Sequence, residues 1–182
     1  MLIVPAMPAT GELPSLYKLG ETRAEVSIDT MEENREAALS LAKQANYHIN
    51  IFTQDMDAPL YDNHEFESHL ARLARKHPNT RIRILVQDSL PAVKRSHCLI
   101  HLAQNMTSSV FIRKPAKPYR KEPASFLVAD GLGLLYRIQG SPMNYDAQLS
   151  FMSPLRARKL NDFFDEVWEQ SAPDPQVRRL YV

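Results

Sequence analysis

The chain has 182 residues, of which 44% are hydrophobic and 24% charged, a composition typical of one globular domain of ordinary size. The net charge of +1 excludes a global attraction to nucleic acid or to anionic membranes, and the single cysteine, Cys98, excludes an internal disulfide. No apolar run approaches the ~20 residues of a membrane span, and the apolar start lacks the basic segment of a signal peptide, so we expect a cytoplasmic protein without membrane contact.

The first two thirds of the chain alternate between strand-like and helical patterns. Thr30 and Glu33 have the spacing of a capping box, and Asp62 and Glu65 repeat it before a second helix. Pro91 opens a third helix. In chain order we expect strands at 22–28, 47–53, 81–88 and 108–114, and helices at 30–45, 62–77 and 91–106. This alternation predicts a parallel sheet with right-handed crossovers.

The last third has a different pattern. Two apolar runs, 125–130 and 134–138, are joined through Gly-Leu-Gly and predict a hairpin, and a further strand is expected at 147–152. A final helix at 153–171 starts with Ser153 and Pro154. Its apolar stripe is the clearest in the chain and consists of Leu160, Phe163, Phe164, Val167 and Trp168.

Prolines and other turn residues gather at both ends of the chain. We therefore expect an irregular N-terminal arm at 1–22, a single domain at 23–171 and a C-terminal tail at 172–182. The tail has a non-helical pattern, and either it packs through Leu180 and Tyr181 or it is free.

Several stretches carry a family resemblance: NIFTQDMDAPLYD, RIRILVQD, SHCLIHLAQ, FLVADGLGLLYR and FFDEVWEQSAPDPQVRRLYV, which together span about residues 25–182. The chain resembles one half of the phospholipase D superfamily, and it is closer still to the uncharacterised phospholipase-D-like domains of proteobacteria that sometimes follow an acetyltransferase domain. The resemblance implies an α/β fold, with a mixed, mostly parallel sheet flanked by helices. Active members pair two halves around one site, so the resemblance also implies a homodimer.

The superfamily's catalytic motif is His-x-Lys-x4-Asp, in which the His attacks a phosphodiester, the Lys holds a phosphate oxygen and the Asp orients the chemistry. Aligned on Asp130, the motif places Pro123 at the nucleophile and Ser125 at the lysine. Neither residue can take that role, so we expect a degenerate member without phosphodiesterase activity. Residues 140–144, Gly-Ser-Pro-Met-Asn, only approximate the Gly-Ser-x-Asn that follows the motif in active members. We expect Asp130 to act through the turn that it makes.

Histidine pairs raise the question of a metal site. His64 and His69 are five residues apart, so their rings diverge on a helix. His97 and His101 are four apart, a spacing that can bind a metal, but their apolar neighbours predict that both face away from the core. We interpret these histidines as solvated or hydrogen-bonded and Cys98 as a buried, inert thiol. We expect no metal and no cofactor.

The carboxyl ends of parallel strands are the usual place for a ligand. There the sequence offers Asp55 and Asp57, then Asp88, then Arg113 and Lys114. The carboxylates would repel a phosphodiester unless a cation or the arginine offsets them, which is a second reason to doubt the ancestral substrate.

Basic residues gather in two stretches of the chain. One is Arg113, Lys114, Lys117, Arg120 and Lys121, with Tyr119 among them, and the other is Arg72, Arg75, Lys76, Arg81 and Arg83. Prolines at 115, 118 and 123 are expected to keep the first stretch extended. An exposed basic loop with an aromatic residue suits contact with phosphates or single-stranded nucleic acid, and it equally suits a solvated loop.

Three functions stay open. The first is a non-catalytic phospholipase-D-like domain that associates with itself or with a protein partner. The second is binding of nucleic acid or a phosphate ligand through the 113–121 loop, and the third is an enzyme with a re-invented site. We assign no catalytic residue, and the candidate ligand-binding residues are Asp55, Asp57, Asp88, His97, Arg113 and Lys114.

Overall fold

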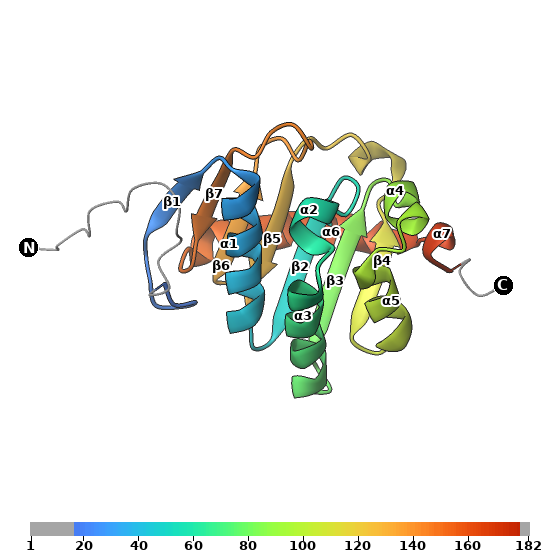
Figure 1. The fold of residues 1–182 in the computed structure, drawn as a ribbon, viewed down its shortest axis with the longest axis horizontal. Helices are drawn as coiled ribbons and strands as arrows, with labels where there is room; N and C mark the ends of the chain where they lie inside the picture. Colours follow the sequence, from blue (N-terminus) through green and yellow to red (C-terminus); the bar gives the residue numbers. More distant parts are fainter. Residues whose placement is uncertain (1–16, 179–182) are drawn as a thin grey trace, which may run out of the picture.

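The computed structural model describes residues 17–178, which form one eight-stranded sheet with helices on both faces (Figure 1). The strands are β1 (Glu25–Ile28), β2 (His48–Thr53), β3 (Arg81–Val86), β4 (Val110–Lys114), β5 (Ser125–Ala129), β6 (Gly133–Arg137), β7 (Ala147–Ser150) and β8 (Ala172–Pro173). The helices are α1 (Met31–Gln44), α2 (Ala58–Tyr61), α3 (His64–Lys76), α4 (Leu90–Lys94), α5 (Cys98–Asn105), α6 (Pro154–Glu169) and α7 (Pro175–Arg178), with a 3₁₀ turn, η1, at Lys117–Tyr119. Within residues 17–178, no helix has the length and apolar character needed to cross a membrane.

The sheet is mixed, as predicted, but it is not mostly parallel. Its strand order is β1-β7-β6-β5-β2-β3-β4-β8, and only the β2–β3 and β3–β4 pairings are parallel, against five antiparallel ones. The hairpin β5–β6 and strand β7 lie between β1 and β2. The prediction was wrong on this point because alternation along a chain indicates crossovers and does not determine which strands become neighbours.

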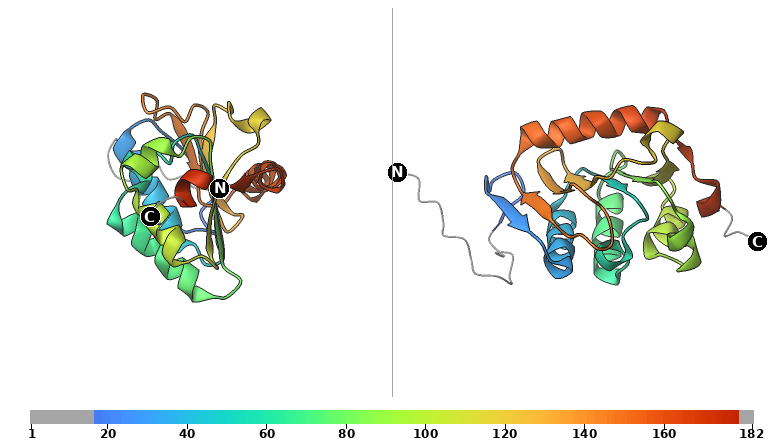
Figure 2. Two further views of the ribbon diagram at one scale, coloured as in Figure 1. Left: turned by 90° about the vertical axis from the view of Figure 1, so that its right-hand side faces the viewer. Right: turned by 90° about the horizontal axis from the view of Figure 1, so that it is seen from above.

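The two faces of the sheet are covered unequally. In the described part of the chain, helices α1, α3 and α5 lie on one face, and α6 alone crosses the other (Figure 2). On the α6 face, Phe164 and Val167 of α6 are fully buried and join a cluster with Phe52 of β2 and Phe126 of β5, which confirms the predicted stripe. A single helix covers only part of that face, so other parts of the strands remain open to solvent or to a ligand.

Two predicted helix starts had different outcomes. The capping box of α1 is present, with the Thr30 hydroxyl accepting from the Glu33 amide and the Glu33 carboxylate accepting from the Thr30 amide. Helix α3 is capped one residue later than predicted, because Asn63 accepts from the amide of Phe66 at 2.8 Å. Asp62 is therefore left free for another partner.

The helix predicted at 91–106 is two helices, α4 and α5. Ser96 between them has a φ of 54°, in the left-handed region that residues other than glycine seldom adopt. His97 follows as the N-cap of α5, with Nδ1 accepting from the Leu99 amide at 3.2 Å. The break turns His97 inward, so the outward orientation predicted for it is wrong.

The C-terminal segment packs as regular structure as far as it is described. Strand β8 pairs with β4, and α7 makes one helical turn, so the non-helical prediction is wrong at Pro175–Arg178. Leu180 and Tyr181 lie outside the described residues. The 115–123 stretch, which was predicted to be extended, contains the 3₁₀ turn η1. Pro118 lies in the first turn of η1, where a missing N–H is tolerated.

Of the predicted arm, residues 1–16 lie outside the described residues. The rest of it contacts the domain: the Leu19 amide donates to the Gln44 side chain at 2.8 Å, and the Tyr17 ring lies 5.7 Å from that of Phe151.

Candidate functional site

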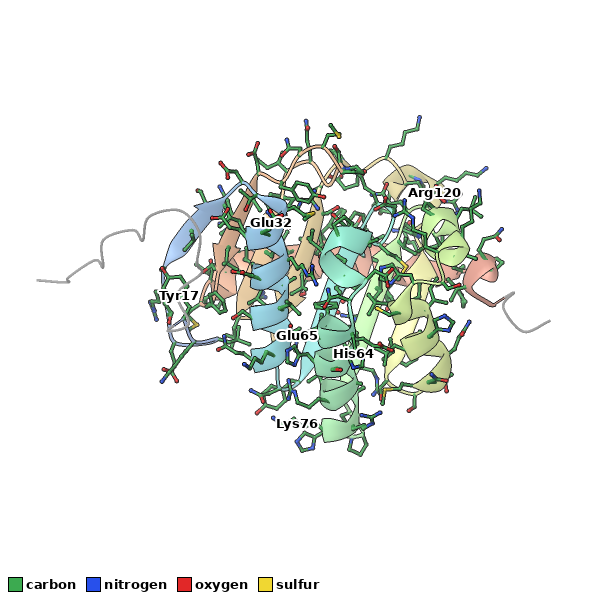
Figure 3. All side chains as sticks on the ribbon, in the orientation of Figure 1. Tyr17, Glu32, His64, Glu65, Lys76 and Arg120 are labelled. Atoms are coloured by element: carbon green, nitrogen blue, oxygen red, sulfur yellow. The ribbon has the colours of Figure 1, made fainter. Side chains whose placement is uncertain are left out.

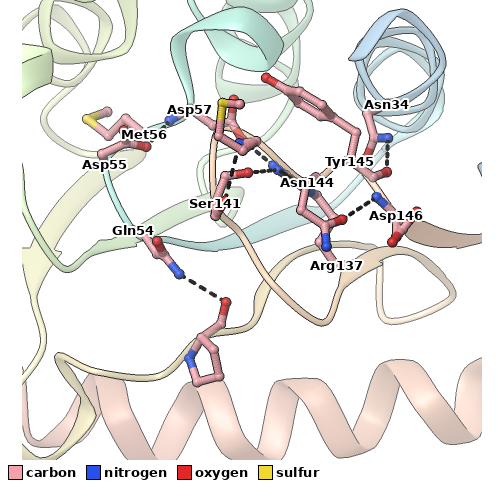
Figure 4. A network of polar contacts seen from close by, with 12 residues as sticks. Asn34, Gln54, Asp55, Met56, Asp57, Arg137, Ser141, Asn144, Tyr145 and Asp146 are labelled. Carbon is pink, nitrogen blue, oxygen red and sulfur yellow. Dashed lines mark hydrogen bonds and ion pairs between the residues drawn. The ribbon is translucent and has the colours of Figure 1, made fainter. Parts of the chain in front are cut away.

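A buried polar network joins the carboxyl ends of β2 and β6 (Figure 4). Asp57, in the β2–α2 loop, forms an ion pair with Arg137, the last residue of β6, and their side chains are 7% and 3% exposed. One Nη of Arg137 donates to the carbonyls of Ser141 (2.8 Å) and Asn144 (2.6 Å), and the guanidinium lies 4.7 Å from the ring centre of Tyr145. Burial raises the pKa of Asp57, while the charge of Arg137 acts in the opposite direction. One arginine thus ties the β2–α2 loop to the loop that follows β6.

The backbone of the β2–α2 loop is unusual. Met56 and Asp57 have φ angles of 69° and 31°, in the left-handed region, although neither is glycine. Met56 is fully buried, and the Asp57 amide donates to the Asp55 carboxylate at 3.0 Å. Such conformations persist only where the surroundings hold them, and here the ion pair to Arg137 does so.

Pro123 and Ser125, the two positions that the sequence analysis aligned with the motif His and Lys, lie at the same end of the sheet as Arg137. Ser125 is the cross-strand neighbour of Arg137, and its buried hydroxyl has no hydrogen-bond partner within residues 17–178. Gly140 packs directly on it, so closely that a Cβ at 140 would stand 1.8 Å from the Ser125 Oγ. The carbonyl of Pro123 accepts from the Gly140 amide at 2.8 Å. The chain therefore fills the space in front of position 125 with its own backbone, and the nearby positive charge of Arg137 is already paired.

Asp130 does make the hairpin turn, with a φ of 53°. Its carboxylate also accepts from three successive backbone amides, those of Asn46 (2.8 Å), Tyr47 (2.8 Å) and His48 (3.0 Å). These amides belong to the start of β2 and the two residues before it. Asp130 therefore connects the β5–β6 turn to β2 by hydrogen bonds. The Asp130 carboxylate is thus bound within the fold, at the end of the sheet opposite to Ser125.

Asp62, His97 and Cys98 bring potential metal-ligand atoms within 4.8 Å of one another. Both imidazole nitrogens of His97 are occupied, since Nδ1 accepts from the Leu99 amide and Nε2 lies 3.2 Å from the carbonyl of Met56. Burial is the main cause that lowers the pKa of His97 and raises that of Cys98, the latter to about 12. Asp62 accepts from the Cys98 amide at 2.9 Å. The His97 imidazole and the Asp62 carboxylate both accept from amides in the first turn of α5, so these groups cap the helix.

The remaining acidic candidates lie around the same edge. Asp55 is half-buried, and Asp88 is exposed and accepts from the Leu90 amide at 3.1 Å. The Asp88 amide donates to the carbonyl of Gln54 at 2.7 Å, so the loops after β2 and β3 touch. The structure brings Asp55, Asp57 and His97 together around Met56, but their polar atoms are largely bound within the protein.

The two basic candidates point to different faces of the sheet, because neighbouring residues of a strand alternate. The Arg113 guanidinium lies on the α6 face, 4.6 Å from the ring centre of Trp168. Lys114 is half-buried and pairs with Ala172 of β8. Beyond β4, Lys117, Arg120 and Lys121 are exposed (Arg120 is labelled near the upper edge in Figure 3).

Of the residues in the network, Asp57 was predicted from the sequence as a candidate, whereas Arg137 and Asn34 were not. Arg137 ends the apolar run Gly-Leu-Leu-Tyr-Arg. A single charged residue at the end of such a run was the sequence feature that could have indicated a buried ion pair. Asn34 is fully buried in α1 and donates to the carbonyl of Tyr145 at 2.7 Å. An asparagine on the apolar side of a helix likewise indicates a buried hydrogen bond. In neither case does the spacing along the sequence identify the partner residue.

Comparisons with known proteins support the fold. The profile described as "Domain of unknown function (DUF7931)" matches residues 30–180. No curated protein sequence matches the chain.

The solved structures that are similar to this chain include TrmBL2, Nuc and NucT. TrmBL2, described as an archaeal chromatin protein with a novel mode of DNA binding, has a TM-score of 0.62 at 14% identity, over 91% of this chain and 57% of that one. The chain thus spans a little over half of the TrmBL2 chain. Nuc from Salmonella typhimurium, a phospholipase D family member, has a TM-score of 0.62 at 12% identity, over 84% of this chain and 99% of that one. NucT from Helicobacter pylori has a TM-score of 0.60 at 10% identity, over 84% and 100%. At these identities the likeness shows the fold alone, and it confirms the phospholipase-D-like fold that the resemblance implied.

Proposed function

The chain belongs to the DUF7931 family, whose description assigns no function, and we propose that this member is a degenerate phospholipase-D-like domain that acts by binding, without hydrolysis. The observation that carries this proposal is the state of the motif positions. Pro123 and Ser125 supply neither nucleophile nor positive charge, and Asp130 is bound to three backbone amides. Gly140 fills the space beside Ser125, and the charge of Arg137 is paired with Asp57. Both observations support a domain without hydrolytic activity.

A phosphodiesterase screen tests the absence of hydrolysis. We expect no turnover of a chromogenic phosphodiester, of oligonucleotides or of phospholipids, with or without added divalent cations. Turnover that is lost in an Asp57→Asn or His97→Gln variant would instead support the re-invented site near Asp55, Asp57, Asp88 and His97, and would overturn the proposal.

The binding that we propose first is self-association, with a protein partner as its close alternative. Phospholipase D enzymes pair two halves around one site, and this chain has the extent of one half. Large apolar side chains are exposed in its C-terminal half, where Ile138 is 64% exposed, Met143 93% and Leu155 78%. Large apolar side chains that are exposed to this extent suit an interface with another protein molecule.

Light scattering after size exclusion tests self-association. We expect the mass of a dimer at high protein concentration, and a monomer for the Ile138→Asp and Leu155→Asp variants. Tyr47→Asp is the matched control, because it makes the same apolar-to-acidic change at a side chain that is 65% exposed and precedes β2. A strict monomer at every concentration would contradict self-association and leave the protein partner.

A second candidate is phosphate or nucleic-acid binding through the 113–121 stretch. It is favoured by the exposure of Lys117, Arg120 and Lys121 on consecutive turns beyond β4. Oligonucleotide binding that falls steeply with salt, and that weakens in a Lys117→Gln/Lys121→Gln variant, would support it. Absence of binding at low salt would refute it.

A further inference from the structure

An open pocket lies on the α6 face, where the helix leaves β2, β3 and β4 uncovered. Its volume is about 470 Å³, within the usual range for a small-ligand site. Three arginines line it, Arg81, Arg83 and Arg113, together with Phe111, Trp168 and His48. We call it the arginine pocket.

Strand register explains why these side chains meet. Arg81 and Arg83 are two residues apart on β3 and so share a face. Arg81 is paired with His48 of β2, and Arg83 with Phe111 of β4. On the other face of the same strand, Ile82 and Ile84 are fully buried under the helices. The charged positions are thus confined to the α6 face of the sheet.

Two of the three guanidinium groups are held on the protein by strong contacts. Arg83 donates to Asp165 at 2.7 Å and to Asn50 at 3.0 Å. Arg81 donates to the carbonyls of residues 78 and 80 at 2.9 and 2.8 Å. Arg113 lies over the indole of Trp168, a contact that fixes its plane. Such held groups lose little freedom when a ligand binds.

The pocket carries uncompensated positive charge. None of the described residues that line it is acidic, and Asp165, which lies on α6, offsets only Arg83. Within residues 17–178, Arg81 and Arg113 each use a single Nη for the protein, which leaves Nε and the other Nη for a ligand. The planar fork of N–H donors on arginine matches the oxygens of a phosphate.

Aromatic side chains give the pocket a second property. Phe111 is half-buried and lies beside Arg83. Trp168 forms the wall between Arg83 and Arg113, with the two guanidinium carbons 5.3 and 4.6 Å from its ring centre. Arginines beside aromatic rings are the combination with which proteins bind a phosphate and stack a base.

We propose that the arginine pocket binds a nucleotide, with phosphate oxygens on the free arginine N–H groups of the pocket and the base against Phe111. The nucleotide is either free or part of a single-stranded nucleic acid. This proposal does not depend on self-association. It also differs from binding through the 113–121 stretch, whose exposed lysines lie beyond the carboxyl end of β4.

The single tryptophan of the chain, Trp168, provides the readout, because it lies in the wall of the pocket. Titration with a uridine mononucleotide, a uridine oligonucleotide and inorganic phosphate at low salt is expected to change its fluorescence. Binding of the mononucleotide identifies a free nucleotide as sufficient, and binding of the oligonucleotide alone identifies a strand. Either outcome supports the pocket if the arginine variants weaken it.

Arg81→Gln and Arg113→Gln are each expected to weaken binding about tenfold or more, the effect of losing a hydrogen bond to a charged group. They should also lower the slope of log affinity against log salt by about 0.7 for each strand phosphate released. Arg75→Gln is the matched control, since it makes the same charge change on the exposed surface of α3. Urea midpoints equal to that of the parent protein verify that the variants are folded.

Four results would overturn the proposal. The first is no binding by any probe at low salt. The second is equal weakening in Arg75→Gln, which indicates unspecific attraction. The third is weakening only in Lys117→Gln/Lys121→Gln, which assigns the binding to the other stretch. The fourth is binding of an acidic polypeptide in place of the oligonucleotide.

Discussion

Asp130 offers the sharpest test, because its carboxylate links the β5–β6 turn to the start of β2. In an Asp130→Ala variant, the amides of Asn46, Tyr47 and His48 lose their acceptor. Water can reach two of these residues, which are exposed, so we take a net contribution of about 1 kcal/mol for each bond, or about 3 kcal/mol in all. Alanine at a φ of 53° costs a further ~1 kcal/mol. The free energy of unfolding should fall by about 4 kcal/mol.

Two further substitutions separate these contributions. Asp130→Gly removes the carboxylate but tolerates the left-handed backbone, so it should cost about 3 kcal/mol. Asp130→Asn keeps one acceptor oxygen and also tolerates that backbone, so about 1–2 kcal/mol is expected. The expected order of stability is Asp, Asn, Gly, Ala.

Urea denaturation followed by circular dichroism measures these differences. With a slope of about 2 kcal/mol per molar urea, the alanine variant should unfold at a midpoint lower by about 2 M. Asp146→Asn is the control, because Asp146 is exposed and its carboxylate accepts no hydrogen bond within the described residues. If Asp130→Ala unfolds at the midpoint of Asp146→Asn, Asp130 does not fasten the turn to β2.

Three other predictions concern buried polar groups. Arg137→Met leaves the Asp57 carboxylate buried and unpaired, so we expect a loss of about 3–5 kcal/mol in urea denaturation and partial recovery in the Asp57→Asn/Arg137→Met double variant; a loss below 1 kcal/mol would count against the pair. Burial lowers the pKa of His97, so the folded state binds fewer protons than the unfolded one. The stability from His97 should be complete above pH ~6.5 and fall as the pH drops through the folded pKa, by at most ~1.4 kcal/mol per pH unit, and a urea series in which His97→Gln shows the same pH dependence would disprove this. Because burial raises the pKa of Cys98 to about 12, native protein should react with iodoacetamide at mildly alkaline pH roughly a thousandfold more slowly than urea-unfolded protein; equal rates would show an accessible, ordinary thiol.

Features that a few neighbouring residues determine could be predicted from the sequence. The Thr30–Glu33 capping box and the apolar stripe of α6 are of this kind, since both depend on spacing within one or two helical turns. The hairpin was predictable because two apolar runs flank Gly131 and Gly133.

Contacts between distant residues could not be predicted in the same way. Asp57 was a candidate, but its partner Arg137 lies 80 residues away. His97 was expected on an exposed helix face, because a regular helix over 91–106 hides the break at Ser96. Asp62 was expected to cap α3 and instead caps α5, through the Cys98 amide. In each case a competing partner elsewhere in the fold overrides a sound local pattern.

The two-residue strand β8 restricts how copies of this chain can meet. It lies outermost beside β4, and its Pro173 has no N–H to offer a further strand. Strand addition needs a row of free donors and acceptors, and proline is one of the means by which natural sheets prevent it. At this edge, the sheets of two molecules would therefore not form one continuous hydrogen-bonded sheet. An assembly of the domain would instead form through side chains on helices or on the faces of the sheet. Substitutions at such an interface could weaken the assembly without disturbing the sheet.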